Sequence, residues 1–248
     1  MPFITGGFPS LDVTRRVLPS LEASGAAIVE VGFPFSDPIA DGPVIAGSMH
    51  DALLAGVTPA AIFHAVNQVR GSTGLGLVAM VSDSIIQRMG PARFVRDAAE
   101  AGFDGLIVPD LDLERAGSLR ELAGGHGLTL SLLVSQLTAP MRLGRLLEAS
   151  SGFLYLLARA GITGEREAPP DIRAKVAQIR ALTALPIAVG FGIASLAHVR
   201  AVTAIADAAI VGSALVRRMG AASDPVAAAA SFIADLAGGL AVRAGESR

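Results

Sequence analysis

Eight short apolar runs, each followed by a longer stretch with helical spacing, constrain the fold of this 248-residue chain most strongly. The runs are nearly continuous rather than alternating, which is typical of strands buried on both faces, as in a parallel sheet. They cover residues 2–5, 27–31, 75–81, 106–108, 128–134, 153–157, 186–189 and 208–211. Strands that alternate with helices indicate right-handed βαβ units.

The number of units and the chain length together favour one architecture. Eight βα units in about 250 residues match the usual size of a (β/α)₈ barrel, or TIM barrel. A doubly wound sheet, the alternative, more often carries a Gly-rich dinucleotide-binding turn after its first strand, and Gly6-Gly7-Phe8-Pro9 does not match that fingerprint. Since the chain contains no linker, low-complexity block or charge run, we predict an α/β fold in which residues 1–248 form a single barrel domain.

Three predicted helices end on a small residue followed by Gly, just before the next strand. The pairs are Ser24-Gly25, Ala101-Gly102 and Ser151-Gly152. Gly at this position is what a left-handed helix cap needs, so we expect each of these glycines to end a helix in that conformation.

The composition excludes several classes of protein. Hydrophobic residues make up 52% of the chain and charged residues only 17%, so intrinsic disorder is excluded. The formal net charge is −2 and no segment gathers Lys or Arg into a stripe, which argues against a nucleic-acid partner.

The sequence points to the cytoplasm. It contains no Cys, which removes disulfides and Cys-ligated metal centres, and its first residues lack the pattern of a signal peptide. Residues 181–199 carry no Asp, Glu, Lys or Arg, but Pro186, Gly190 and Gly192 interrupt them. We therefore interpret this stretch as strand, loop and helix start rather than as a membrane span.

Glu30 is a carboxylate near the carboxyl end of an otherwise apolar predicted strand. The active sites of barrels lie at that end. If Glu30 points into the barrel, burial raises its pKa and suits it to acid or base catalysis near neutral pH. The alternative is a strand-end Glu that faces solvent or pairs with an Arg.

The segment between the second and third predicted strands is rich in Pro and Gly and contains Asp37 and Asp41. A long loop of this kind inside a compact domain is more often functional than connective. Two carboxylates at different depths of one site can acquire different pKa values and so divide the roles of acid and base. The alternative for Asp41-Gly42 is an ordinary turn.

Gly-containing turns follow the sixth, seventh and eighth predicted strands, at residues 158–164, 190–195 and 212–214. In barrels, the turns after the last two strands frequently bind phosphate through backbone N–H groups at a helix N-terminus. Alternatively, each Gly only permits a tight turn. Because Gly-containing turns follow both the seventh and the eighth predicted strands, where barrels bind phosphate, we favour phosphate binding.

The absent residue types narrow the chemistry. Lys175, the only lysine, lies in a predicted helix, so no strand-end lysine is available for a Schiff base. The four histidines, His50, His64, His126 and His198, show no metal-ligand spacing. We therefore expect carboxylate acid–base catalysis on a phosphorylated substrate, with no metal and no cofactor.

Six motifs resemble one known family. They are PFITGGFP at residues 2–9, EVGFPFSDPIADGP at 30–43, AGVTP at 55–59, RAGITG at 159–164, GFGI at 190–193 and GSA at 212–214. Together they closely resemble the tryptophan synthase α subunit family nearly from end to end, and the second motif is highly specific.

The resemblance implies a (β/α)₈ barrel that cleaves indole-3-glycerol phosphate to indole and glyceraldehyde 3-phosphate in a retro-aldol step. The family's catalytic Glu and Asp correspond to Glu30 and Asp41. The implied phosphate-binding residues are Gly164, Gly192, Gly212 and Ser213, and the implied substrate-binding residues are Phe3, Met80, Ile107, Tyr155, Thr163, Phe191 and Ile210.

The resemblance also implies a partner. The family acts in an α₂β₂ complex, in which indole passes through a tunnel to a β subunit for condensation with L-serine. Asp37 and Pro38 correspond to the loop that faces this β subunit.

The sequence departs from the family pattern at three places. Ser82 and Ser84 stand where the family usually has a Tyr-x-Asn pair, and residues 134–137 replace an Ala-Pro-Thr segment. The family also carries a leading helix beneath the barrel, which has no counterpart before residues 2–5. We therefore expect either that the barrel floor needs another cover or that the sequence is shortened at its start.

Two other functions remain open on the same residues. One is a stand-alone lyase that releases free indole. The other is a non-catalytic partner that only activates a β subunit, which the loss of the Tyr-x-Asn pair makes conceivable.

Overall fold

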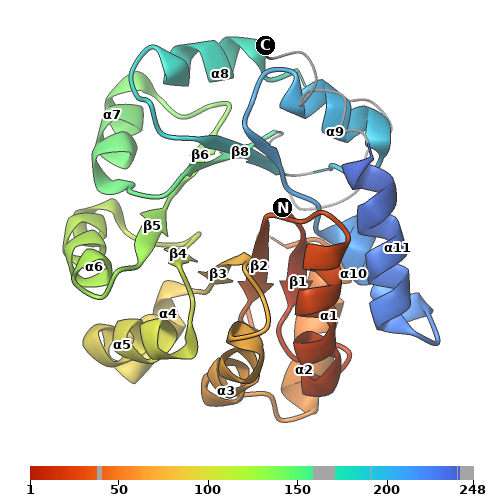
Figure 1. Cartoon of the computed structure of the whole chain (residues 1–248). Helices are drawn as coiled ribbons and strands as arrows, with labels where there is room; N and C mark the ends of the chain where they lie inside the picture. Colours follow the sequence, from red (N-terminus) through yellow and green to blue (C-terminus); the bar gives the residue numbers. More distant parts are fainter. Residues whose placement is uncertain (38–40, 159–170, 191, 239, 241–248) are drawn as a thin grey trace.

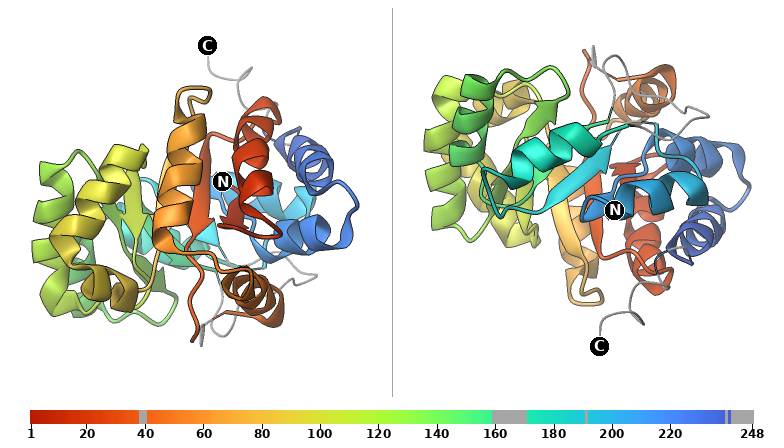
Figure 2. Two further views of the ribbon diagram at one scale, coloured as in Figure 1. Left: turned by 90° about the horizontal axis from the view of Figure 1, so that it is seen from below. Right: turned by 90° about the horizontal axis from the view of Figure 1, so that it is seen from above.

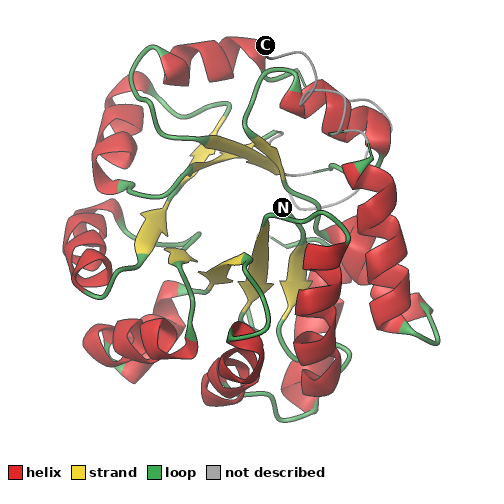
Figure 3. Ribbon diagram, viewed as in Figure 1, coloured by secondary structure: helices red, strands yellow, loops and turns green. Residues whose placement is uncertain are grey.

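The computed structural model describes residues 1–37, 41–158, 171–190, 192–238 and 240. Short parallel strands form an inner ring, and the helices pack around its outside (Figures 1 and 3). The strands are β1 (Phe3–Thr5), β2 (Ile28–Gly32), β3 (Gly76–Met80), β4 (Gly105–Ile107), β5 (Thr129–Ser131), β6 (Leu133–Ser135), β7 (Leu154–Leu157), β8 (Ile187–Gly190) and β9 (Ala208–Ala209).

Every strand except β5 is followed by at least one helix. The two side views show these helices wrapped around the strands (Figure 2). The helices are α1 (Leu11–Ala23), α2 (Pro43–Leu54), α3 (Pro59–Arg70), α4 (Asp83–Met89), α5 (Pro91–Ala101), α6 (Leu113–Gly125), α7 (Pro140–Ala149), α8 (Arg173–Arg180), α9 (Leu196–Thr203), α10 (Ser213–Ala221) and α11 (Pro225–Ala237).

The strands close into a barrel of eight positions. They form a five-stranded sheet, β1 to β5, and a four-stranded sheet, β6 to β9, all in parallel pairs. Only Leu132 separates β5 from β6, so these two strands are halves of the single predicted strand 128–134. On the other side, Pro2 and Val211 form a parallel bridge, and Phe3 N donates to Val211 O at 2.9 Å. The predicted (β/α)₈ barrel is confirmed.

The alternation of side chains along each strand produces two separate cores. On β2, Val29 and Val31 belong to the large cluster between strands and helices, whereas Ile28 packs on a smaller cluster inside the barrel. The buried members of this inner cluster are Val78, Ile107, Phe153, Tyr155, Ala188 and Ile210. Side chains an even number of residues from Ile28 along β2 therefore also point into the barrel.

Two of the three predicted glycine caps are confirmed. Gly25 and Gly102 have φ angles of 94° and 95° after α1 and α5. The prediction for Gly152 was wrong, because α7 ends at an extended Ser150 and Gly152 has no positive φ. Gly152 is instead required for close approach, since a Cβ there would lie 2.7 Å from the Oγ of Ser131.

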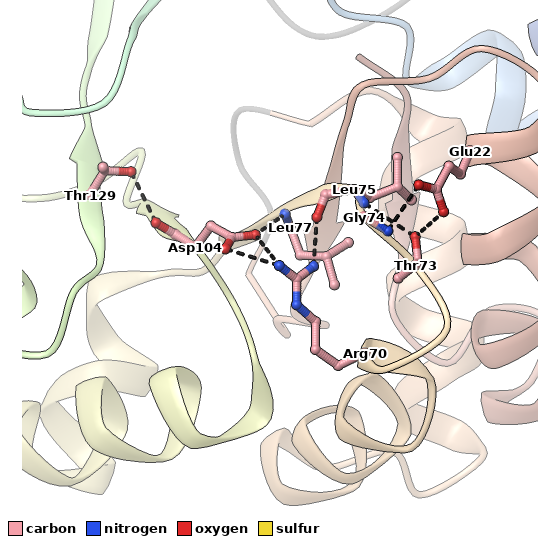
Figure 4. Close-up of polar contacts among 8 residues, drawn as sticks. All are labelled: Glu22, Arg70, Thr73, Gly74, Leu75, Leu77, Asp104 and Thr129. Carbon is pink, nitrogen blue, oxygen red and sulfur yellow. Dashed lines mark hydrogen bonds and ion pairs between the residues drawn. The ribbon is translucent and has the colours of Figure 1, made fainter.

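An Arg–Asp clamp ties α3 to β3 and β4 at the amino-terminal end of the barrel (Figure 4). Arg70 donates to the carbonyl of Leu75 at 2.5 Å and to both carboxylate oxygens of Asp104 at 3.1 Å. Asp104 also accepts the backbone N–H of Leu77 at 2.7 Å, and Leu75 N donates to Thr73 Oγ1 at 3.3 Å. The Asp104 carboxylate therefore holds the start of β3, through Leu77 N, and at the same time pairs with Arg70 of α3.

The second half of the barrel repeats this clamp at β8 and β9. These are the seventh and eighth of the eight strand positions, whereas β3 and β4 are the third and fourth. Arg180 donates to Leu185 O at 3.4 Å and pairs with Asp207, which accepts Ile187 N at 2.7 Å. Leu185 N donates to Thr183 Oγ1 at 3.2 Å. Both clamps follow the pattern R-x-x-T-x-L-x-(L/I), starting at Arg70 and at Arg180, so equivalent contacts close the same end of each half-barrel.

A cavity of about 520 Å³ opens at this amino-terminal end. Residues just before or at the start of strands line it, among them Ala27, Gly76 and Pro186, together with Ile233 and Leu236 of α11. Barrel active sites lie at the opposite end, so this cavity is not the candidate site.

Within the described ranges, no single helix is long and apolar enough to cross a membrane. The bent pair α2 and α3, at 97° to one another, reaches that length and composition only when the two helices are taken together.

Candidate functional site

Glu30 lies in the middle of β2 and points into the barrel. It is in register with Phe3 on β1 and Val78 on β3, and it has the same parity as Ile28. The side chain is fully buried, and neither carboxylate oxygen has a hydrogen-bond partner among the described residues. Burial raises the pKa of Glu30 to about 8, although the positive charge of the Met1 amino group lowers it in part. At neutral pH this group is therefore mainly the protonated acid.

Asp41 is held by the start of α2. Gly42 is the N-cap of that helix and Pro43 its first residue, so Asp41 lies just before the first turn. Its side chain is partly buried, and burial raises its pKa to about 6. Asp41 is therefore mainly ionised at neutral pH, in contrast to Glu30.

Tyr155 interacts electrostatically with both carboxylates. It is buried on β7, inside the barrel, and its pKa is raised first by burial and then by the charges of both Glu30 and Asp41. Glu30 on β2 and Tyr155 on β7 both point into the barrel. Both carboxylates thus act through their charges on the only tyrosine of the chain.

Apolar side chains line the space around these groups. Ile107, Tyr155 and Ile210 are buried in the inner cluster, and Met80 packs against it. Phe3 belongs to a neighbouring cluster, which Met80 also contacts. Of the residues that the family resemblance assigns to the substrate pocket, Thr163 and Phe191 lie outside the described residues.

Gly212 and Ser213 form the start of α10. Gly212 is the N-cap and has no side chain that could cap the first turn, and Leu215 N donates to Gly212 O at 2.9 Å. The N–H groups of Ser213 and Ala214, which precede Leu215, are the ones that this helix start can offer to an anion. A Cβ at Gly212 would lie 3.6 Å from Phe3, the ladder partner of Glu30. Gly192 follows β8 with a φ of 81°, and Gly164 lies outside the described residues. The start of α10 is therefore close to β1, the strand that pairs with the Glu30 strand β2.

Asp37 is exposed after the end of β2, and Pro38 lies outside the described residues. Among the described residues, no group of three or more His, Asp or Glu side chains is arranged to hold a metal ion.

Comparison with known proteins identifies the family. The family model for the tryptophan synthase alpha chain matches residues 1–241. The chain belongs to the tryptophan synthase alpha chain family. The resemblance seen in the sequence motifs is confirmed, and with it the prediction of a lyase of tryptophan biosynthesis.

Several members of this family are similar over most of their length. The tryptophan synthase alpha chain of Prochlorococcus marinus MIT 9313 is 45% identical over 225 residues, which are 90% of this chain and 82% of the relative. That of Chloroflexus aurantiacus is 40% identical over 245 residues, which are 97% and 92% of the two chains.

Solved structures agree. A structure of Mycobacterium tuberculosis tryptophan synthase has a TM-score of 0.88 at 33% identity and covers 96% of this chain and 90% of that chain. The Pyrococcus furiosus tryptophan synthase α₂β₂ complex has a TM-score of 0.89 at 31% identity, with 96% of each chain covered.

Where the family usually has a Tyr-x-Asn pair, this member has a polar network that sequence reasoning did not foresee. Ser82 Oγ donates to Asp110 Oδ2 at 2.7 Å, and Asp83 N donates to Asp110 Oδ1 at 2.8 Å. Ser82 also lies 2.9 Å from Ser84 Oγ, and Asp83 pairs with Arg115. These contacts tie the loops after β3 and β4 together. The only sequence signal for Asp110 is its place in the turn that follows the buried strand β4, three residues after Ile107.

Proposed function

We propose that this chain cleaves indole-3-glycerol phosphate to indole and glyceraldehyde 3-phosphate, with Glu30 as the acid–base catalyst and Asp41 as the carboxylate that stabilises the indole cation. The observation that carries the proposal is the Glu30 carboxyl, fully buried inside the barrel with no hydrogen-bond partner among the described residues. This burial raises the pKa of Glu30 to about 8, while the partial burial of Asp41 raises its pKa to about 6. Two titratable groups pushed apart in this way are suited to different roles at one pH.

The chemistry follows from these protonation states. Protonated Glu30 donates its proton to C3 of the indole, which becomes a cationic indolenine. The resulting carboxylate then takes the proton of the side-chain hydroxyl next to C3, the C–O bond becomes the aldehyde, and the electron pair of the broken C–C bond returns to the ring. Glu30 ends protonated again, so the proton count balances.

Asp41 acts on the other side of the ring. As an ionised carboxylate it accepts a hydrogen bond from the indole N–H, and this interaction strengthens as the ring becomes positive. Since partial burial excludes water from Asp41, its charge is less screened than on an open surface.

The substrate is held at both ends in this proposal. Phe3, Met80, Ile107, Tyr155 and Ile210 enclose the indole, together with Phe191 and Thr163. The phosphate binds to backbone N–H groups at Gly212 and Ser213, with Gly192 and Gly164. The start of α10, which no side chain caps, supports this assignment, because a helix N-terminus favours an anion.

We also propose that the chain works in the cytoplasm with a tryptophan synthase β subunit, as an α₂β₂ complex that condenses the indole with L-serine. The Pyrococcus furiosus relative is described as such a complex. Asp37, exposed next to the site, and Pro38 are assigned to the surface that faces the β subunit.

Incubation of the purified chain with indole-3-glycerol phosphate, with and without a β subunit, tests the proposal by the release of indole. We expect slow cleavage by the chain alone and strong stimulation by the β subunit. High turnover without any stimulation would indicate a stand-alone lyase. Stimulation of the β subunit by a chain that releases no indole would indicate a non-catalytic activator.

A further inference from the structure

Asp41 is not on a strand, so its position depends on how α2 is attached to the barrel. The helix begins one residue after Gly42, and Ala46 N donates to Gly42 O at 3.0 Å in its first turn. Any tilt or shift of α2 therefore moves Asp41 relative to the barrel interior.

One buried hydrogen bond fastens α2 to the barrel. The Oγ1 of Thr5, at the end of β1, lies 2.6 Å from the Oγ of Ser48 on α2. The two side chains are 1% and 2% exposed, so no water competes for them. Ser48 Oγ also donates to Ile45 O at 2.7 Å. Because a hydroxyl has only one proton, Thr5 is the donor to Ser48 when Ser48 donates to Ile45.

The relay ends in the part of α2 that carries Asp41. Ile45 lies in the first turn of the helix, four residues after Asp41. Its side chain is buried in a cluster with Phe3, Met49 and Val216, so the turn is held by packing as well as by the hydroxyl groups.

The other end of the relay is fixed to the strand that carries Glu30. Thr5 is in register with Gly32 and Phe3 with Glu30, and Gly6 N donates to Gly32 O at 2.8 Å. The Thr5–Ser48 bond therefore joins the β1–β2 ladder, which holds one carboxylate, to the helix that holds the other.

We infer that Thr5 and Ser48 are positioning residues, which set the place of the Asp41 carboxylate relative to Glu30 through the hydrogen-bonded relay Thr5–Ser48–Ile45. The inference rests on the proposed function. Neither hydroxyl contacts the substrate in this account. They act because displacement of a catalytic group by about 1 Å can cost about a hundredfold in rate.

The test compares Ser48→Ala and Thr5→Val with the control Ser150→Ala. Ser150 is also buried and donates to a helix carbonyl, Leu146 O at 2.8 Å, but it lies after α7, away from β1 and α2. For both site variants we expect kcat for indole release to fall about 10- to 100-fold, with KM changed less than about twofold, because the lost interaction develops in the transition state. Ser150→Ala should keep the wild-type kcat.

Three further measurements separate positioning from simple destabilisation. The acid limb of the pH profile of kcat/KM should move to lower pH in Ser48→Ala, since a displaced Asp41 becomes better hydrated. Thr5→Ser keeps the hydroxyl and should therefore have nearly the wild-type kcat. The double variant Thr5→Val/Ser48→Ala should have a kcat no lower than that of the slower single variant, because both changes break the same hydrogen bond.

The result that overturns the inference is a Ser48→Ala protein with a lowered urea midpoint but unchanged kcat and pH profile per folded molecule. Asp41→Asn, measured in parallel, keeps the two proposals apart. Loss of activity in Asp41→Asn with a silent Ser48→Ala rejects only the relay. Full activity in Asp41→Asn rejects the assigned mechanism itself.

Discussion

Gly190 packs against the ring of Tyr155 so closely that a Cβ at position 190 would lie 2.6 Å from Cζ of that ring. Tyr155 in turn interacts with both Glu30 and Asp41. The absence of a side chain at Gly190 therefore leaves room for the Tyr155 ring inside the barrel.

Gly190→Ala should push Tyr155 into the space next to the carboxylates. We expect most of the indole-releasing activity to be lost, with a free energy of unfolding lowered by about 1–3 kcal/mol, as for other overpacked cores. Steady-state kinetics and urea unfolding measure the two effects. Gly117→Ala is the control, because a Cβ at this position in α6 meets no atom within 4 Å. Equal kinetics for the two variants would contradict the packing argument.

Glu30→Gln should abolish activity and change how stability depends on pH. Burial raises the pKa of Glu30 from 4.5 to about 8, so in this range the folded state holds a proton that the unfolded state has lost. The contribution of Glu30 to stability is therefore full below pH 4.5 and is lost as the pH rises through about 8, by up to about 1.4 kcal/mol per pH unit.

Urea unfolding of the wild type and Glu30→Gln between pH 6.5 and 8.5 measures this effect. Burial also lowers the pKa of the Met1 amino group to about 6, so this group makes the stability rise with pH over part of this range. Because both proteins share this effect, the difference between their free energies of unfolding is the informative quantity. The variant should gain stability relative to the wild type as the pH rises. A difference that does not vary with pH would show that Glu30 is not buried as an acid.

The rate of cleavage should follow a bell-shaped pH profile. Activity requires ionised Asp41, with a pKa of about 6, and protonated Glu30, with a pKa of about 8. We expect kcat/KM to rise near the first value and to fall near the second, since this parameter reports the free enzyme. A rate that keeps rising through pH 9 would exclude Glu30 as the proton donor.

Gly212 offers a matched pair of variants for the phosphate site. A Cβ would meet Phe3 at 3.6 Å, an ordinary contact, so Gly212→Ala should bind glycerol phosphate nearly as the wild type does. Gly212→Asp places a like charge at the anion site and should weaken binding by at least about tenfold. Titration calorimetry measures both affinities. Similar affinities for the two variants would place the phosphate elsewhere.

The two Arg–Asp clamps should contribute independently to stability. In Asp104→Ala and Asp207→Ala the amides of Leu77 and Ile187 lose their acceptors, which costs about 1–3 kcal/mol each. The ion pairs themselves are half-exposed and add little. Because the clamps lie in opposite halves of the barrel, the losses should add in the double variant. Non-additive losses in urea unfolding would show that the halves are coupled there.

The strands were predictable because a strand buried on both faces appears in the sequence as a continuous apolar run. For the same reason Glu30 was conspicuous, as one charged residue within such a run. The Pro- and Gly-rich loop made Asp37 and Asp41 candidates, and the family motif singled out Asp41 as the catalytic one. The break of the fifth strand at Leu132 was not predictable, since a change of pairing partner leaves no mark on hydrophobicity.

The sequence by itself determined the alternation of strands and helices, the residue types of the site and the family, because these depend on neighbours along the chain. Only the tertiary structure decided that Glu30 faces inward without a hydrogen-bond partner among the described residues, and that the charges of both carboxylates act on Tyr155. It also decided that Asp110 binds Ser82 and that Thr5 reaches Ser48. These relationships join residues that are far apart in the sequence. Their distances and their exclusion of water arise only when the barrel closes.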